Sequence, residues 1–330
     1  MLKISGSHIN ENNEGYPSLY CLKALGALFV VCLHFYNWES GYMYYIVYPI
    51  LTTAVPFFFM ISGFFLYRDN SIKATLKCRK ALDKISWITL YAIVFYYMAY
   101  NLQKNAIPFN DVNSFVAFLF YGTSGHLWYM IAYIEVLVIM LIALRLNKVK
   151  ILMGLAPLFY VFCLLMGSYN FLDLTTPFQR FIVRNFLTLG IPCFGVGWML
   201  KRYESKVRQY ADKIVLLFCL SYIILVIEII WDFKCAPYKE YMMFTIPTAA
   251  AMMMFFISRP ALGKGSIFEL IGKKYSAGIY IYHILIGNLI VIFNQQYHII
   301  PAIILPIIIF VCSVAFTYIW DNALKKVISK

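Results

Sequence analysis

Apolar runs long enough to cross a membrane alternate with short polar stretches along most of the chain. A bilayer core about 30 Å thick is crossed by about 20 residues of helix, and ten segments come close to that length. The pattern therefore predicts an all-α, polytopic integral membrane protein with about ten transmembrane helices. The expected spans are residues 17–36, 44–66, 87–102, 126–144, 151–169, 181–200, 214–231, 241–258, 277–293 and 300–320.

The third of these segments, 87–102, is short and rich in tyrosine. The neighbouring stretch FVAFLFYG (115–122) fits a re-entrant or interfacial piece beside it, so the number of spans is an approximate expectation. No internal repeat, Gly/Ser linker or low-complexity tract divides the sequence. We therefore expect residues 1–330 to form a single domain.

Composition supports a membrane protein and narrows its chemistry. Hydrophobic residues make up 62% of the chain and charged residues only 13%, whereas soluble domains carry about 25% charged residues. The eight cysteines are scattered, with no CxxC pair. Neither a zinc site nor a disulfide framework is expected from such spacing, so the sequence predicts no metal site.

The net charge of +13 is concentrated in one set of loops. Those loops and the N-terminus hold 22 of the Lys and Arg residues, against four in the loops on the other side. Such an asymmetry marks the cytoplasmic side of a membrane protein. It predicts a multi-pass protein of a cell membrane with both termini in the cytoplasm, and it gives no reason to expect a nucleic-acid partner. The basic loops are 67–86, 145–150, 201–213, 259–276 and 321–330.

The basic loop 69–86 has a pattern of its own. Ile72, Leu76 and Leu82 recur at roughly helical spacing, with lysines and an arginine between them. A helix of this kind lies in the inner interface among anionic lipid headgroups. Alternatively, the loop only determines topology.

Two ionisable residues occupy the first expected span, although charged groups at membrane depth are costly and normally face a protein interior or a cavity. Lys23 and His34 are eleven residues apart, which in a helix is about 16 Å and three turns plus about 20°. They share one face but are too far apart to bond. A polar groove along this face would accommodate both, and it would suit an extended anionic ligand whose reactive end reaches deep into the membrane.

The second span contains Pro56, which can kink a helix, followed by Ser62 and Gly63. Ser62 is expected at a depth similar to that of Lys23, and Gly63 would let another group approach the backbone closely. The pair is a candidate binding site. The alternative is close helix packing through small residues, which is common in membranes.

Two further ionisable residues lie inside expected spans. Glu135 could orient an imidazole or neutralise a buried cation. His283 is expected about six residues from the cytoplasmic end of its span, far in depth from His34. It would serve the binding pocket near Lys23 or simply pack.

Four more candidates lie towards the outer ends of spans. Arg184 either snorkels to the interface or, with Asn185 and the break at Gly190–Pro192, lines a cavity. His126 and Trp128 fit an aromatic belt at the outer boundary or contribute to the site.

Five stretches in order resemble acyltransferase family 3, membrane-bound enzymes that include O-acetyltransferases of bacterial surface polysaccharides. Together they extend over nearly the whole chain. They are Lys23-x10-His34, FFFMISGFFL (57–66), GHLWYMIAYIEVL (125–137), RNFLTLGIPCFGVGWML (184–200) and YSAGIYIYHILI (275–286).

The resemblance implies transfer of an acyl group, usually acetyl, from cytoplasmic acyl-CoA to a hydroxyl of a cell-surface polysaccharide or lipid-linked glycan precursor, at the bacterial cytoplasmic membrane. It makes His34 the central catalytic residue and requires the cation at Lys23, where family members more often have arginine. The family's basic pattern before the third span is matched approximately by Arg79-Lys80 and Lys84, so any of these could bind acetyl-CoA.

The chemistry is consistent with these assignments. Histidine titrates near working pH and suits a general base that takes a hydroxyl proton. Alternatively, His34 could carry the acyl group itself in a covalent relay. A lysine amine could hold the phosphates of coenzyme A.

Some relatives carry a fused extracytoplasmic hydrolase-like or racemase domain. This chain ends soon after its last expected span, so acceptor recognition is expected inside the bundle or through a separate extracytoplasmic or assembly-complex partner. Two other functions stay open. Polar intramembrane residues also mark the path of a transporter or flippase, and a non-catalytic anchor of a polysaccharide assembly complex is conceivable.

Overall fold

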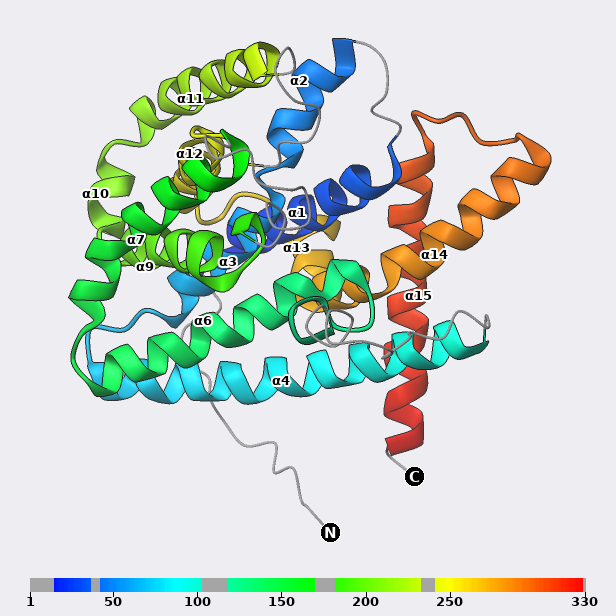
Figure 1. Cartoon of the computed structure of the whole chain (residues 1–330), viewed down its shortest axis with the longest axis horizontal. Helices are drawn as coiled ribbons and strands as arrows, with labels where there is room; N and C mark the ends of the chain where they lie inside the picture. The colour runs from blue at the N-terminus through cyan, green and yellow to red at the C-terminus, as the bar shows by residue number, and fades with distance from the viewer. Residues whose placement is uncertain (1–14, 37–41, 103–117, 170–181, 233–240, 329–330) are drawn as a thin grey trace.

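The computed structural model describes residues 15–36, 42–102, 118–169, 182–232 and 241–328 (Figure 1). Every regular element among these residues is a helix. The elements run in the order α1 (Pro17–Phe35), α2 (Tyr42–Leu51), α3 (Ala54–Leu66), α4 (Ser71–Leu102), η1 (Gly125–Leu127), α6 (Trp128–Arg145), α7 (Val149–Cys163), η2 (Leu164–Ser168), η3 (Phe186–Gly190), α9 (Ile191–Arg202), α10 (Glu204–Gln209), α11 (Ala211–Asp232), α12 (Thr245–Ser258), α13 (Ile267–Leu270), η4 (Ile271–Tyr275), α14 (Ser276–Tyr297) and α15 (Leu305–Ile328).

Seven helical stretches of the described chain are long and apolar enough to cross a membrane. The protein is therefore an all-helical, multi-pass membrane protein, as the sequence predicts, although the count of ten spans is not confirmed. The expected span 241–258 appears as the shorter apolar helix α12, and 181–200 appears as η3 with α9. Of the stretch 115–122, residues 118–121 are helical and Gly122 lies in a turn, while 115–117 lie outside the described residues. The seven stretches long enough to cross a membrane are Pro17–Phe35, Tyr44–Leu66, Gly125–Arg145, Val149–Ser168, Ala211–Trp231, Ile267–Tyr297 and Leu305–Ala323.

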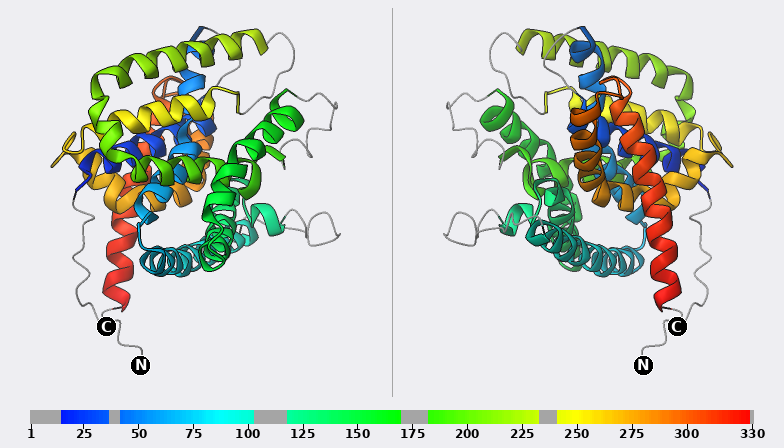
Figure 2. Two further views of the ribbon diagram at one scale, coloured as in Figure 1. Left: turned by 90° about the vertical axis from the view of Figure 1, so that its left-hand side faces the viewer. Right: turned by 90° about the vertical axis from the view of Figure 1, so that its right-hand side faces the viewer.

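Helix α4 merges two segments that the sequence pattern separates. The basic stretch expected at the interface and the expected span 87–102 form one unbroken helix of 32 residues. No glycine or proline interrupts it, so nothing in the backbone ends the helix between the two parts. It packs along α6 at the side of the molecule opposite α11 (Figures 1 and 2).

Helix α1 lies at the centre of the bundle, in contact with α3, α12, α14, α15 and η4. Small residues make this possible, since Ala24 and Ala27 are buried on α1. At Gly272 of η4, a Cβ would overlap the main-chain carbonyl of Tyr20. The helix that carries Lys23 and His34 is thus held from several sides.

Helix α3 crosses α9 at backbone contact. A Cβ on Gly63 would overlap the carbonyl oxygen of Phe194, and one on Gly197 would overlap that of Met60. Small residues that let helix backbones approach are typical of membrane bundles. Gly63 therefore serves helix packing in this structure.

The last motif lies in a longer helical stretch than its pattern predicts. The expected span 277–293 is part of a stretch of 31 residues, Ile267–Tyr297, because α13 and the π-helix η4 lead directly into α14. His283 therefore lies 16 residues after Ile267, about 24 Å along the helix, instead of about six residues after the start of its span.

Candidate active site

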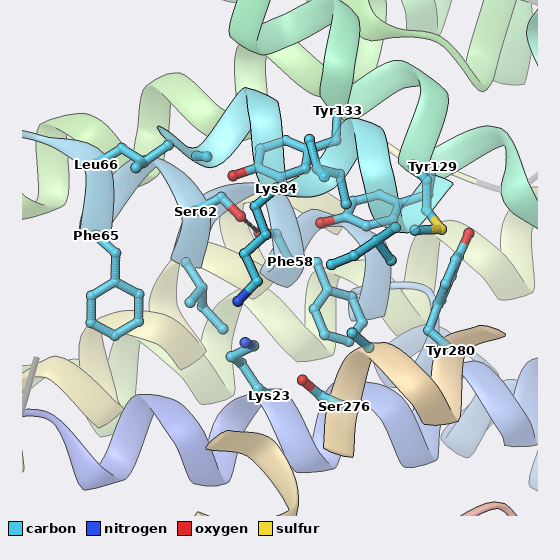
Figure 3. A pocket seen from close by; sticks show the side chains of 16 residues that line it. Lys23, Phe58, Ser62, Phe65, Leu66, Lys84, Tyr129, Tyr133, Ser276 and Tyr280 are labelled. Atoms are coloured by element: carbon cyan, nitrogen blue, oxygen red, sulfur yellow. Dashed lines mark hydrogen bonds between the residues drawn. The ribbon is translucent and has the colours of Figure 1, made fainter. Parts of the chain in front are cut away.

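A cavity of about 280 Å³ surrounds Lys23. Five helices line it, and it contains two amines, those of Lys23 on α1 and Lys84 on α4, which point towards each other (Figure 3). No carboxylate is among the lining residues that the structure describes. Two cations that face one cavity without a counter-charge in its wall make it suited to an anion.

Polar hydroxyls face the two amines across this cavity. Ser62 lines it, donating a hydrogen bond of 2.7 Å to the carbonyl of Phe58 in its own helix. The hydroxyls of Tyr129 and Tyr133 point towards Ser62 from α6 (Figure 3). Of the pair Ser62 and Gly63, only the serine therefore reaches the cavity.

His34 lines a second cavity, of about 430 Å³, near the other end of α1. His126, Trp128 and Arg184 line it as well. The cationic Arg184 is close enough to His34 to interact with it electrostatically. His34 is among the exposed residues and lines this cavity, so a ligand there can reach it.

The two cavities meet at one side chain. Tyr280 of α14 lines both of them. Its hydroxyl donates a hydrogen bond to the main-chain carbonyl of His126, and its ring packs against that of Tyr129, 5.5 Å between centroids. The sequence predicts one continuous groove between Lys23 and His34, whereas the structure has two cavities that share an aromatic residue.

Three histidines gather beside the second cavity. The ring centroids of His34 and His283 are 5.2 Å apart, and those of His126 and His283 are 5.3 Å apart. The expectation that His283 lies far in depth from His34 is wrong, because α13 and η4 carry α14 deeper before this residue is reached. His283 is fully buried and does not line the cavity around Lys23.

The basic residues of α4 separate into different faces. Arg79 lines a groove between α4 and α6, together with Arg145, and Lys80 lines neither of the two cavities. Lys84 is the residue of this pattern that the structure places next to Lys23. Its position on the face of α4 that meets α1 depends on the packing of the bundle and could not be inferred from spacing alone.

The remaining candidates are apart from the two cavities. Glu135 lines neither and forms no hydrogen bond with the three imidazoles among the described residues. Asn185 caps η3, where its side chain accepts from the main-chain N–H groups of Leu187 and Thr188. Asn185 thus shapes the chain next to Arg184.

Two residues were missed in the sequence. Tyr280 and Tyr241 line the cavity of His34, but tyrosine is too frequent here, with 27 copies, to single out either one. A signal existed only for Tyr280, which lies three residues before His283 in the same motif. No group of three His, Cys, Asp or Glu side chains among the described residues could hold a metal ion.

This arrangement can perform group transfer between two ligands. A basic cavity can hold an anionic donor, and an accessible imidazole beside a guanidinium can take a proton and stabilise a developing negative charge. Lys23 and His34 place these functions on one helix, about 16 Å apart.

Comparisons with known proteins give two partial relatives and one matching family. The chain is 26% identical over 256 residues to an amino-acid racemase of Enterococcus faecalis, a match that covers 71% of this chain and 36% of that protein. A second amino-acid racemase of Enterococcus faecalis is 36% identical over 129 residues, which are 36% of this chain and 17% of that protein. The chain thus spans only a minor part of the length of these relatives. No solved structure matches it. The family model described as an acyltransferase domain matches residues 16–320, and the chain therefore belongs to acyltransferase family 3.

Proposed function

We propose that this protein is an O-acyltransferase that moves an acetyl or other acyl group from acyl-CoA to a hydroxyl of a cell-surface polysaccharide or lipid-linked glycan precursor. One observation carries the proposal. Helix α1 presents Lys23 to a cavity that holds two amines and His34 to a second cavity, and Tyr280 borders both. Membership of acyltransferase family 3 supports acyl transfer as the reaction class.

The cavity of Lys23 is the donor site in this proposal. Lysine amines bind phosphate as point charges, and those of Lys23 and Lys84 face each other there (Figure 3). The rest of the wall is mainly apolar, with Ile85 and Ile88 from α4. An acyl-CoA would place phosphates at the amines and its acyl thioester towards Tyr280.

The cavity of His34 is the acceptor site. Its wall combines the aromatic side chains of Tyr48, Trp128 and Tyr241 with the hydroxyls of Thr52 and Ser124. Aromatic faces that flank a few convergent polar groups suit a ligand whose orientation must be fixed. A sugar ring with its hydroxyls has this mixed character.

The reaction balances with groups that the chain supplies. The acceptor oxygen attacks the thioester carbonyl carbon, and its proton passes to a nitrogen of His34 while the new C–O bond forms. The C–S bond then breaks, and the protonated imidazole returns the proton to the departing thiolate, which leaves as free coenzyme A. A covalent relay through His34, in which the imidazole nitrogen first takes the acyl group, gives the same products.

Orientation and location complete the proposal. The basic loops favour a cytoplasmic position for the Lys23 end of α1, where acyl-CoA is available, and for both chain termini. We place the protein in a bacterial cytoplasmic membrane, surrounded by lipids, with the acceptor or a separate extracytoplasmic or assembly-complex partner on the other side. Racemisation is not part of the proposal, since the match covers only 36% of the relative that bears this name.

The test uses purified protein in detergent, radiolabelled acetyl-CoA and crude envelope glycan. We expect label in the glycan with wild-type protein, and a loss of at least about 100-fold in His34→Ala, as is typical when a general base is removed. His298→Asn is the control, because His298 lies at the end of α14 in a left-handed conformation that asparagine tolerates. It should transfer at the wild-type rate.

Two outcomes would contradict the proposal. Wild-type protein that neither transfers nor hydrolyses the label, yet moves a solute across vesicle membranes, would make it a transporter. Equal transfer by the wild type and a folded His34→Ala variant would remove His34 from the mechanism.

A further inference from the structure

His283 is the best-enclosed member of the histidine cluster, and its hydrogen bonds reveal its tautomer. Its Nδ1 atom lies 3.1 Å from the carbonyl oxygen of Ile279 and 2.8 Å from that of Tyr280. A carbonyl oxygen only accepts hydrogen bonds, so Nδ1 must carry the proton. In the neutral ring, Nε2 is then a bare acceptor.

This acceptor has no partner. The Nε2 atom of His283 is one of four buried side-chain nitrogen and oxygen atoms in the described part of the chain that form no hydrogen bond. Another is Nε2 of His126, whose ring lies 5.3 Å from that of His283. A buried polar atom without a partner destabilises the fold. Two such atoms in one cluster lower the stability of the fold, which favours a functional role for the cluster.

The position of the ring shows which group this acceptor can serve. His283 is 0% exposed and lines neither cavity, whereas His34, 5.2 Å away, is open to the second cavity. His283 therefore packs against His34 without reaching the cavity, so it does not contact a ligand there. Phe35 closes the site on another side, with its ring perpendicular to that of His283.

We propose that His283 is the positioning residue of His34, and that its Nε2 accepts a hydrogen bond from the second ring nitrogen of His34 when the first takes the acceptor's proton. The inference rests on the proposed function. As a general base, His34 must be neutral before transfer and becomes imidazolium during it, when a preformed acceptor is most valuable. His283 keeps its own Nδ1 proton throughout, so the proton that His34 takes returns to the leaving thiolate and the balance is unchanged.

A neutral imidazole fits this role in a membrane bundle. A buried carboxylate would carry a permanent charge at high cost, whereas neutral His283 is held by two main-chain carbonyls of its own helix. The charged neighbour of the cluster is Arg184, which interacts with His34 and Tyr280. The remaining titratable neighbours are His126 and Tyr280.

Two variants of His283 separate positioning from packing. The side-chain oxygen of glutamine can reach roughly the position of Nε2, so His283→Gln keeps an acceptor, while His283→Leu removes it. In the labelled acetyl transfer assay we expect kcat of His283→Leu to fall at least about tenfold, within the roughly 10⁴-fold loss known for the orienting partner of a catalytic histidine. KM for acetyl-CoA should stay within about twofold, because His283 does not line the donor cavity, and His283→Gln should recover most of kcat.

The control is Thr248→Val, which removes another buried, unpartnered polar atom, from α12. It should leave kcat and KM unchanged. If His283→Leu does not elute as a folded particle in gel filtration, His283→Met, which also lacks a comparable acceptor, replaces it.

Three results would overturn the inference while wild-type protein still transfers acetyl. They are an unchanged kcat in the folded Leu or Met variant, a loss confined to KM, or a Gln variant as impaired as the Leu variant. Absence of transfer in the wild-type protein would instead contradict the proposed function itself.

Discussion

Lys23 and Lys84 line the same cavity although the two residues are 61 positions apart in the sequence. Two ammonium groups at close range repel each other, most strongly where little water screens them. A bound polyanion would remove this repulsion. The electrostatic repulsion between the two amines is offset only when an anionic ligand is bound. This favours a binding role for Lys23 and Lys84 over a structural one.

The donor site predicts different effects for the lysines of α4. Lys84→Gln should raise KM for acetyl-CoA by about tenfold, since one charge-assisted hydrogen bond to phosphate contributes about 1.5–3 kcal/mol. Lys73→Gln, an exposed position on the same helix that lines neither cavity, should not change KM. Steady-state kinetics over a range of acetyl-CoA concentrations measure both, and equal KM values for wild type and Lys84→Gln would exclude Lys84 from donor binding.

At Lys23, transfer activity should depend on the presence of a positive charge more than on the shape of the side chain. Lys23→Arg keeps a cation in the cavity and should retain transfer activity, while Lys23→Gln removes it and should lose at least about tenfold in kcat/KM, on the same estimate for a charged hydrogen bond. The assay is again transfer from labelled acetyl-CoA. Equal activity in both variants would show that the cation is dispensable.

Part of the site was predictable at the residue scale. The spacing of Lys23 and His34 predicts one helix that carries both, and α1 is indeed a single helix that presents each to a cavity. The contact of His34 with His283 was not predictable, because it depends on where α14 begins and how it crosses α1. Periodicity within a segment contains no information about either.

At the scale of elements, helix starts and ends explain most differences between expectation and structure. Apolar content located seven stretches that are long apolar helices in the described chain. Helix α4 continues through its basic half because nothing in residues 71–102 breaks a helix. The π-helix η4 likewise joins α13 to α14 without a break, although it contains Gly272. A count of spans from hydropathy therefore fails where a helix is amphipathic at one end and apolar at the other.

The crossing of α3 and α9 yields a stability prediction. In Gly63→Ala the new Cβ would overlap the carbonyl oxygen of Phe194, so the helices must move apart, at a cost of about 1–3 kcal/mol for overpacking. Gly154→Ala in α7 is the matched control, because its Cβ would meet no atom within 4 Å. Alanine in a helix interior gains about 0.5–1 kcal/mol over glycine.

Thermal unfolding in detergent measures both variants. We expect a lower midpoint for Gly63→Ala and an unchanged or higher midpoint for Gly154→Ala. An unchanged midpoint in Gly63→Ala would mean that the two backbones do not cross at contact.

At the scale of the whole molecule, a polar cluster ties the start of α1 to α9 and α10. The hydroxyl of Tyr16 donates to Glu204 at 2.5 Å, and Lys201 forms an ion pair with the same carboxylate at 2.7 Å. Arg208 contacts it as well. The cluster joins segments 188 residues apart in the chain and anchors the helix that carries Lys23 and His34.

This cluster predicts a dependence of stability on pH. Burial raises the pKa of the Glu204 carboxyl, but hydrogen bonds from Lys201 and Tyr16 and the positive charge of Lys201 outweigh it, so the pKa lies below its usual value. The folded protein then binds fewer protons at Glu204 than the unfolded chain, whose pKa is about 4.3. Its stabilising contribution is present above that pH and is lost as the pH falls through the lower folded value.

The test compares the melting midpoint of wild type and Glu204→Gln from about pH 6.5 to about pH 3.5, across the carboxyl range. Wild type should melt at least about 2 °C higher near pH 6.5, and the difference should shrink as the pH falls. Asp212→Asn, an exposed carboxylate at the start of α11, should show no such convergence. A difference that is constant over the whole range would contradict the assignment.

The separation of the Lys23 cavity from the His34 cavity leads to a prediction about how the donor thioester is kept from water. Tyr280 borders both, buried to all but 8% of its surface and bonded to the main chain of His126. If its ring keeps water of the outer cavity from the thioester, Tyr280→Ala should open a path for hydrolysis. Removal of a large buried side chain leaves a cavity that its surroundings only partly fill.

The measurement is the ratio of free labelled acetate to acetyl-glycan formed from acetyl-CoA. Tyr280→Ala should raise this ratio by at least about tenfold, equivalent to about 1.4 kcal/mol of lost discrimination against water. Tyr280→Phe keeps the ring and removes only the hydroxyl, so its ratio should stay near that of wild type even if its rate falls. A ratio in folded Tyr280→Ala equal to that of wild type would mean that a group other than Tyr280, which lines both cavities, separates the donor thioester from water.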